Sequence, residues 1–221
     1  LELDPNGRTV WVEPGVIYDR LRNAAEVHHL TLAPDPATHA YCTIGGMIGN
    51  NSCGSHSVMG GRTSDNVEEL EILTYDGVRM RVGKTDDAEL DRIIREGGRR
   101  GEIYGRLREL RDRYADEIRA RYPRIPRRVS GYNLDELLPE NGFHVARALV
   151  GSESTCVTVL GAKMRLIPSP PYRSLLVMGY PDPGLAADQV PAIMEYGPVA
   201  LEGFHTHVIE NMMRKGKPLP G

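Results

Sequence analysis

The chain has 221 residues, of which 40% are hydrophobic and 26% are charged, and its formal net charge is −3 at pH 7. These values are typical of a soluble globular protein that holds one large domain, or one domain and part of another. They give no reason to expect nucleic-acid binding, and the sequence shows neither a signal peptide pattern at its start nor an apolar run long enough to span a membrane.

The opening residues LELDPNGRTVWVEPG predict a strand, a turn and a second strand. Because a strand begins almost at the first residue, we expect the natural polypeptide to start earlier. Residues 16–27 predict a short helix, with Ile17, Leu21 and Ala24 near one face. Residues 30–36 are expected to be extended, since Pro34 and Pro36 disfavour a helix.

A dense glycine cluster follows, in which Gly45, Gly46, Gly49, Gly54, Gly60 and Gly61 lie among small polar residues. Glycine loses much backbone entropy on folding and disfavours regular structure, so the cluster predicts a loop whose backbone approaches a ligand or takes φ > 0. Hydroxyl and amide side chains at Thr43 and Asn50, with apolar Ile44 and Met47 between them, indicate a ligand with a polar or phosphate part and a flat part. The alternative is a surface loop without function.

Two common phosphate-binding motifs are missing from the cluster. It contains no G-x-x-x-x-G-K-[ST], which excludes a P-loop, and no G-x-G-x-x-G after a strand, which excludes the nicotinamide-type fingerprint. The three cysteines, Cys42, Cys53 and Cys156, form no C-x-x-C and are odd in number. They favour a reducing, cytoplasmic compartment over a disulfide framework or a zinc site, and Cys42 and Cys53 are interpreted as small buried residues rather than a redox pair.

Residues 67–82 predict a β-hairpin that turns at Asp76-Gly77, and residues 86–121 predict a helical region capped by Asp86 or Asp87. Three glycines, ending at Gly101, are expected to interrupt this region before a second helix from about Ile103. The expected apolar stripe of that helix comprises Leu107, Leu110, Tyr114 and Ile118. Its many arginines alternate with acids, as in the i,i+4 pairs Arg108–Asp112 and Arg113–Glu117, which favours a solvated helix face over a nucleic-acid patch.

The last part of the chain predicts a long half-buried strand over 157–167, a new strand over 172–182 and a helix over 185–195. His205 and His207 lie two residues apart and should point to different faces of a helix, so no metal site is expected. The closing RKGKPLPG has the composition of an unfinished loop.

The segment PDPATHAYCTIGGMIGNNSCGSHS, followed by GRTSDNVEELEILTYDG, resembles the second half of the PCMH-type FAD-binding domain of the vanillyl-alcohol oxidase superfamily. Within it, the resemblance is to the branch of D-lactate dehydrogenase, D-2-hydroxyglutarate dehydrogenase and the D subunit of glycolate oxidase. LVGSESTCVTVLGAKMRLIPSP at 149–170 resembles the later flavin-contacting segment of the same family, usually written GSEGTLG. The resemblance covers residues 1–181 and implies an α+β fold.

The resemblance divides the chain into the C-terminal part of an FAD-binding domain at 1–171, without its first subdomain, and the start of a substrate cap domain at 172–221. The first subdomain's pyrophosphate loop, P-x-G-x-G-T-S, is absent from the sequence. Carried over by position, the neighbours of a non-covalent FAD would be Pro34, Asp35, Thr43, Gly45, Gly46, Asn50, Asn51, Ser52, Cys53, Gly54, Glu153, Ser154, Thr155 and Val159. The family's usual glycine and leucine are replaced by Ser154 and Cys156.

Tyr132 and Asn133, in SGYNLDEL, resemble a segment near the substrate edge of the flavin, although a packing role for Tyr132 and a turn at Asn133 are equally compatible with the sequence. The implied reaction is oxidation of a D-2-hydroxy acid by hydride transfer to the flavin, with an electron acceptor that the residues do not specify. The 221-residue chain alone is expected to be inactive. Alternatives are a non-catalytic flavin- or nucleotide-binding subunit and an enol-ether reductase of the same superfamily.

Overall fold

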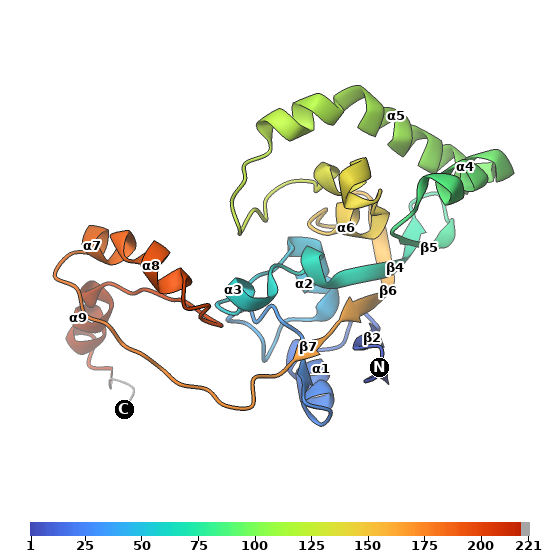
Figure 1. The fold of residues 1–221 in the computed structure, drawn as a ribbon. Helices are drawn as coiled ribbons and strands as arrows, with labels where there is room; N and C mark the ends of the chain where they lie inside the picture. The colour runs from blue at the N-terminus through green and yellow to red at the C-terminus, as the bar shows by residue number, and fades with distance from the viewer. Residues whose placement is uncertain (218–221) are drawn as a thin grey trace.

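The computed structural model describes residues 1–217 and has an α+β fold built on a five-stranded antiparallel sheet with strand order β1-β2-β6-β4-β5 (Figure 1). This confirms the expected fold class. The strands of this sheet are β1 (Glu2–Asp4), β2 (Thr9–Val12), β4 (Val67–Thr74), β5 (Arg79–Gly83) and β6 (Val157–Arg165). A separate two-stranded pair joins β3 (Leu30–Thr31) to β7 (Ile167–Pro168).

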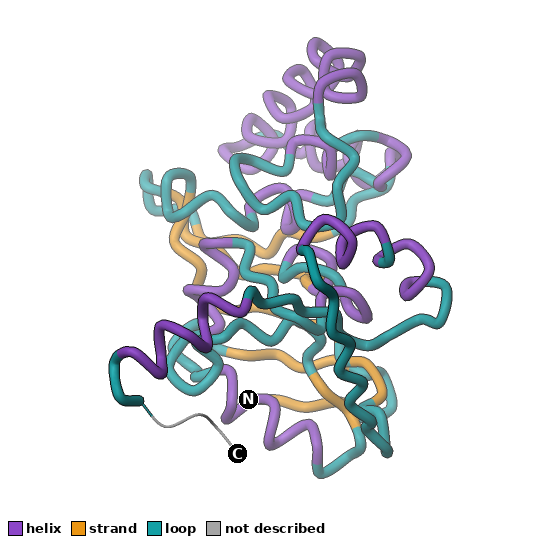
Figure 2. Tube along the Cα trace, turned by 90° about the vertical axis from the view of Figure 1, so that its left-hand side faces the viewer, coloured by secondary structure: helices purple, strands orange, loops and turns teal. Residues whose placement is uncertain are grey.

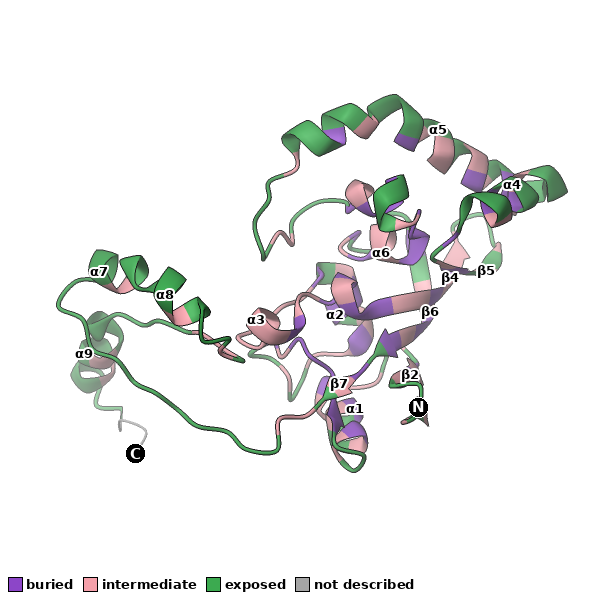
Figure 3. Ribbon diagram, viewed as in Figure 1, coloured by how far each residue is buried: buried purple, intermediate pink, exposed green. Residues whose placement is uncertain are grey.

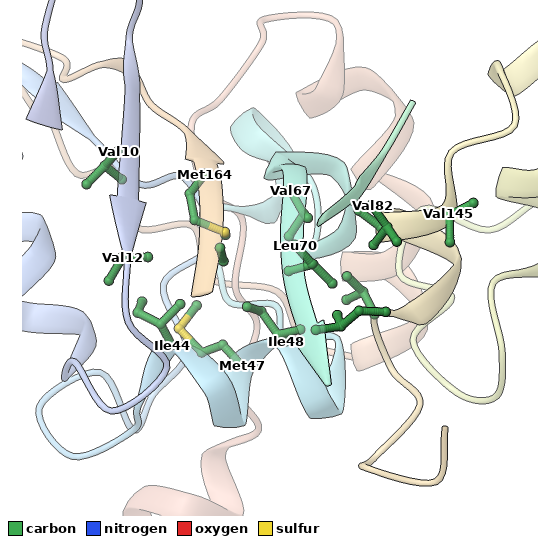
Figure 4. Packing of buried hydrophobic residues seen from close by; sticks show 14 of the residues in the cluster. Val10, Val12, Ile44, Met47, Ile48, Val67, Leu70, Val82, Val145 and Met164 are labelled. Atoms are coloured by element: carbon green, nitrogen blue, oxygen red, sulfur yellow. The ribbon is translucent and has the colours of Figure 1, made fainter. Parts of the chain in front are cut away.

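The central strands bury one side of the sheet, as their sequence patterns predict. Strands β4 and β6 pair with Leu70 opposite Ala162 and Ile72 opposite Val159, and the β4–β5 hairpin places Leu70 opposite Val82. The buried side chains pack against α1 (Tyr18–Glu26), α2 (Ile44–Asn50) and α6 (Val145–Leu149). Figure 4 shows Ile44, Met47 and Ile48 of α2 directed toward the strands that carry Val12, Met164 and Leu70.

The glycine cluster forms helices rather than the expected loop. Thr43 caps α2, and a short helix, α3 (Ser57–Gly60), follows it. Three glycines cost α2 about 1 kcal/mol each relative to alanine. Burial of Ile44, Met47 and Ile48 contributes about 1.5–3 kcal/mol for each side chain, which outweighs that cost. Helix propensity alone therefore gave the wrong element here.

Helices α4 (Asp87–Glu96) and α5 (Gly98–Arg121) lie on one side of the sheet, beyond its β4–β5 end (Figures 1 and 2). Asp86 caps α4 as expected, but α5 begins at Gly98 and includes Gly101. A Cβ on Gly101 would lie 2.9 Å from the Ile93 carbonyl oxygen, so this glycine lets the two helices approach closely. Tyr104 is buried on α5, whereas Tyr114 of the expected stripe is exposed.

The expected ion pairs within α5 are wrong in detail, although its polar face is solvated. Arg108 binds Asp91 of α4 at 2.9 Å, and the Arg113 guanidinium lies over the Tyr114 ring. Arg108 is thus paired across two helices and Arg113 contacts the adjacent Tyr114 ring. Other i,i+4 pairs do form in α5, namely Arg106–Glu102 and Arg121–Glu117. Three single-turn helices lie in the connections: η1 (Ser64–Asn66) precedes β4, and η2 (Leu134–Leu137) and η3 (Pro139–Asn141) lie between α5 and α6.

Residues after β7 differ most from the expectation. Residues 172–182 form no strand, because no neighbouring strand pairs with them and an isolated strand is unstable in water. The expected helix 185–195 is divided into α7 (Pro183–Asp188) and α8 (Val190–Met194), with Pro191 in the first turn of α8. Figure 3 shows this part of the chain largely exposed.

Helix α9 (Thr206–Arg214) corrects the expectation for the two histidines. His205 is the N-cap of α9, not a residue within it, and its ring stacks on that of His207 with centroids 4.2 Å apart. No group of three or more metal-ligating side chains occurs among residues 1–217, and no helix in that range could cross a membrane. Part of RKGKPLPG, residues 218–221, lies outside the described residues.

His144, the N-cap of α6, is 5% exposed, and burial lowers the pKa of its imidazole to about 4, with Arg147 and Lys84 contributing. The folded pKa lies below that of the unfolded chain, so the unfolded state binds more protons between pH 6.5 and about 4. Stability is therefore complete above this window and is lost as the pH falls through it, by up to about 3 kcal/mol.

We expect His144→Asn, which retains an N-cap side chain, to remove this pH dependence. The measurement is urea unfolding of both proteins at several pH values between 6.5 and 4. The difference between their free energies of unfolding isolates His144 from other titrating groups. If the free energy of unfolding depended on pH equally in both proteins, His144 would not be the source of the pH dependence.

Candidate functional site

Helix α2 presents one face that carries almost no side-chain atoms. Its opposite face buries Ile44, Met47 and Ile48. A Cβ on Gly46 would meet only Thr43 Oγ1, at 3.3 Å, and one on Gly49 would meet nothing within 4 Å. The helix is held at its start by the Thr43 Oγ1 atom, which accepts the Gly46 N–H at 3.1 Å. The open face therefore offers bare backbone to a flat group.

The second segment that the resemblance assigns to flavin contact, residues 151–155, lies directly beside the end of α2. The Gly151 N–H donates to the Ile48 carbonyl at 2.8 Å, and the Glu153 N–H donates to the Gly49 carbonyl at 3.1 Å. Two segments about a hundred residues apart in the sequence thus meet, and Glu153, Ser154 and Thr155 remain exposed there.

The Pro34-Asp35 segment forms a third part of the same region. Asp35 Oδ1 accepts the His56 N–H at 2.8 Å, and Asp35 Oδ2 lies 2.8 Å from His56 Nδ1. A Cβ on Gly54 would lie 1.9 Å from the Asp35 carbonyl oxygen, so only glycine permits this approach. Pro34 is buried, whereas Asp35, Ser52, Cys53 and Gly54 are half-buried.

The glycines of the cluster therefore have different roles. A Cβ on Gly45 would collide with Pro14, and a Cβ on Gly60 would collide with Ala33. Together with Gly54 they permit close packing of this chain against itself. Only Gly46 and Gly49 leave open space, which the sequence pattern could not distinguish.

The loop from Gly151 to Thr155 has an unusual backbone. Gly151 has φ +84°, and the non-glycine residues Glu153 and Ser154 have φ +49° and +60°. Left-handed backbone costs a residue with a Cβ about 1–2 kcal/mol, and such strain is common at functional sites. Glycine at the position of Ser154 would relieve this strain.

We expect Ser154→Gly to stabilise the protein by about 0.5–1 kcal/mol, because relief of strain exceeds the added entropy of the unfolded chain. Ser152, which is buried and has an ordinary φ, provides the matched control. Ser152→Gly should destabilise. Urea unfolding of the two variants tests this, and a loss of stability in Ser154→Gly would contradict the strain argument.

Tyr132 and Asn133 have distinct surroundings. The Tyr132 hydroxyl lies 2.8 Å from Thr155 Oγ1, at the exposed edge of the 151–155 loop. Asn133 is buried, and its Nδ2 donates to the Val150 carbonyl at 2.9 Å, which anchors the loop. Substrate contact by either residue stays a prediction. Val159, on β6, packs partly buried against the core, and its flavin contact likewise stays a prediction.

An ion pair fixes the segment after α3. Arg62 Nη2 binds Asp65 Oδ1 at 2.8 Å, and Arg62 Nη1 donates to the Arg128 carbonyl at 2.6 Å. Burial by itself raises the pKa of Asp65, but hydrogen bonds from Arg62 outweigh it and lower the pKa below its ordinary value. The pair thus ties the glycine cluster to the loop before Tyr132.

The structure places here three residues that are not among the flavin contacts implied by the resemblance: His56, Ser57 and Thr63. Thr63 holds Ser52 in place, since its Oγ1 donates to the Ser52 carbonyl at 2.7 Å. Asn51 Oδ1 accepts the Ser64 N–H at 2.9 Å, while Asn51 Nδ2 and Ser57 Oγ are buried without a partner. The available signals were the residues GSHS for His56 and Ser57 and the residues GRTSDN for Thr63. The cysteines are all free: Cys42 and Cys53 are half-buried, and Cys156 is exposed.

Residues 1–83 match the family model described as "FAD binding domain". This range includes β1 to β5 and the whole glycine cluster.

Two of the curated relatives described next match over a longer range than this family model. The chain is 32% identical to a D-2-hydroxyglutarate dehydrogenase from Pseudomonas putida over 215 residues, which cover 97% of this chain and 21% of that protein. It is 27% identical to a D-lactate dehydrogenase from Archaeoglobus fulgidus, over 95% of this chain and 36% of that protein. Over 83 residues it is 36% identical to glycolate oxidase subunit GlcD of Escherichia coli, covering 38% of this chain and 17% of that protein. The chain spans about a fifth of the length of the first of these relatives.

Proposed function

We propose that this chain, whose residues 1–83 match the family model described as "FAD binding domain", holds the isoalloxazine and ribityl side of FAD in a dehydrogenase or oxidase of D-2-hydroxy acids. The observation that supports this most is the side-chain-free face of α2 beside the 151–155 loop. The names of the relatives support the substrate class.

The residues present fit a flat cofactor. Gly46 and Gly49 leave the α2 face open, and the buried Nδ2 of Asn51 and Oγ of Ser57 are hydrogen-bonding groups without a partner in the same segment. Exposed Glu153, Ser154 and Thr155 border that face through the Glu153–Gly49 hydrogen bond. Thr43, Gly45, Asn50, Ser52, Cys53 and Gly54 would complete the pocket.

When bound, FAD supplies the acceptor for the hydride that leaves the substrate carbon. This chain's residues bind and orient the ring: the α2 face supports one side, and the strained 151–155 loop fixes its edge. We propose that Tyr132 contacts substrate through its hydroxyl, which lies 2.8 Å from Thr155 Oγ1 in this structure. We propose the division into an FAD-binding part at 1–171 and the start of a cap domain at 172–221.

The test of the reaction uses the longer natural polypeptide loaded with FAD. Under anaerobic conditions, D-2-hydroxyglutarate, D-lactate and glycolate are each added while the visible absorbance of oxidised flavin is followed. Bleaching by one of them, and not by its L-enantiomer where one exists, is the expected result. Binding of FAD without bleaching by any hydroxy acid would instead support the non-catalytic subunit, and bleaching only by a nicotinamide cofactor would support the enol-ether reductase.

A second test concerns the 221-residue chain alone, which we expect to bind FAD at micromolar affinity or worse. The family's pyrophosphate loop is absent from the sequence, and burying phosphate charge without donors is unfavourable. Hydrogen bonds of about 1 kcal/mol each must offset several kcal/mol of lost freedom. Titration of the chain with FAD, followed by flavin fluorescence, measures the affinity. A nanomolar dissociation constant would show that the upstream loop is dispensable.

We propose a reducing cellular compartment for this protein on the basis of its cysteines. Cys42, Cys53 and Cys156 are all free, which favours a reducing environment such as the cytoplasm.

A further inference from the structure

A second pocket lies apart from the proposed flavin site, between the β4–β5 hairpin, the helices α4 and α5, and the start of α6. Its volume is about 600 Å³, and none of its lining residues belongs to the predicted flavin contacts. Lys84 and Thr85 border it from the end of β5, Arg100 and Tyr104 from α5, and His144 and Arg147 from α6.

Four cations line this pocket, and none of them has a carboxylate partner among residues 1–217; the two considered as ligand-binding groups are Arg100 and Lys84. No carboxylate among residues 1–217 lies within ion-pair distance of Arg100 or Lys84. Arg100 is half-buried, its guanidinium lies 5.6 Å from the Tyr104 ring centroid, and its Nε is buried without a hydrogen-bond partner. The stem of Lys84 packs against Gly142, where a Cβ would lie within 2.2 Å of Lys84 Cε. Arg100 is therefore half-buried at the pocket, whereas Lys84 is exposed at its rim with its stem beside Gly142.

The acidic residues at the pocket bind cations elsewhere. Glu68 and Glu69 lie 3.5 and 3.3 Å from the Lys163 ammonium, which does not line the pocket. Glu89 is paired with Arg92, also outside the pocket. Arg81 lies over the Trp11 ring, and Arg147 donates to the carbonyls of Asp65 and Val67. The charge left without a partner in the pocket is positive.

His144 adds a neutral donor. Its Nδ1 accepts the Arg147 N–H at 3.4 Å, which places the proton of the uncharged ring on Nε2. The side chain is 95% buried, yet Nε2 has no hydrogen-bond partner among the described residues, and the residue lines the pocket. The Nε2–H group is therefore available to donate to an acceptor in the pocket.

We propose that this pocket binds a small oxyanion, a carboxylate or a phosphate ester, through Arg100, Lys84 and the Nε2–H of His144. Guanidinium and ammonium groups bind both kinds of oxyanion, and charge-assisted hydrogen bonds are about twice as strong as neutral ones. The volume exceeds that of one inorganic phosphate, so the ligand is a small metabolite whose remaining part contacts Val82, Ile93 and Tyr104. This site does not depend on the proposed flavin function.

Isothermal titration calorimetry of the purified protein with citrate, and separately with inorganic phosphate, tests the proposal at constant ionic strength set with chloride. We expect saturable binding of at least one anion, weakened at least 10-fold by Arg100→Gln and by Lys84→Gln and largely restored by Arg100→Lys. Tighter citrate binding identifies a carboxylate ligand, and tighter phosphate binding a phosphate ester.

Arg106→Gln is the matched control. Arg106 lies on the same helix, is 73% exposed at its side chain and pairs with Glu102, away from the pocket. We expect the Arg106→Gln protein to bind citrate or phosphate with the same affinity as the unchanged protein. Circular dichroism and thermal unfolding establish that each variant is folded. Absence of saturable binding of both anions, or equal weakening by Arg106→Gln and Arg100→Gln, would overturn the proposal.

Discussion

Gly46→Val is expected to abolish FAD retention by the longer flavoprotein while leaving the chain folded. The open side of Gly46 is where the flavin ring is proposed to lie, and a branched side chain would occupy that space. The fold should tolerate the change, because the nearest atom to a Cβ there is Thr43 Oγ1 at 3.3 Å. Valine is also no worse than glycine in a helix. The FAD content of the purified protein, measured by absorbance after denaturation, is the readout.

Gly105→Val is the matched control for this variant. Gly105 is another helical glycine, on α5, with no atom within 4 Å of an added Cβ, and it lies outside the proposed site. It should retain FAD at the unchanged stoichiometry. Full FAD content in Gly46→Val would place the ring elsewhere. Loss of solubility in Gly46→Val but not in Gly105→Val would show that the α2 face is covered by protein.

Gly54→Ala, unlike Gly46→Val, is expected to destabilise the fold itself. The expected loss is about 3 kcal/mol or more, because the added Cβ overpacks the site and forces a backbone shift. The added Cβ would lie 1.9 Å from the carbonyl oxygen and 2.3 Å from the carbonyl carbon of Asp35. Neither atom can move without displacing the Pro34–Pro36 segment and the Asp35–His56 contacts. Urea unfolding of the 221-residue chain measures this, since the effect does not require FAD.

Gly49→Ala separates this steric effect from a general effect of losing glycine. Gly49 lies in α2 with nothing within 4 Å of an added Cβ, and alanine stabilises a helix relative to glycine by about 1 kcal/mol. We therefore expect Gly49→Ala to unfold at a higher urea concentration than the unchanged chain. Equal stability of the Gly49 and Gly54 variants would contradict the close approach of Asp35.

The sequence by itself determined the elements that have strong local signals. The hairpin at β4 and β5 followed from alternating apolar residues and an Asp-Gly turn, and the start of α4 followed from Asp86, which caps it. The FAD-binding resemblance also rested on short sequence motifs, and the family match over residues 1–83 confirms it. These features depend on neighbouring residues in the chain, so periodicity and capping chemistry suffice to predict them.

Only the tertiary structure decided the rest, because those features depend on contacts between distant residues. Burial of Ile44, Met47 and Ile48 made a helix of a glycine-rich stretch, and the approach of Asp35 separated the packing role of Gly54 from the open face at Gly46. The Arg108–Asp91 pair formed across two helices, where an i,i+4 rule could not find it. Residues 172–182, predicted as a strand, have no partner strand, since side-chain pattern sets a propensity while hydrogen bonding needs a neighbour.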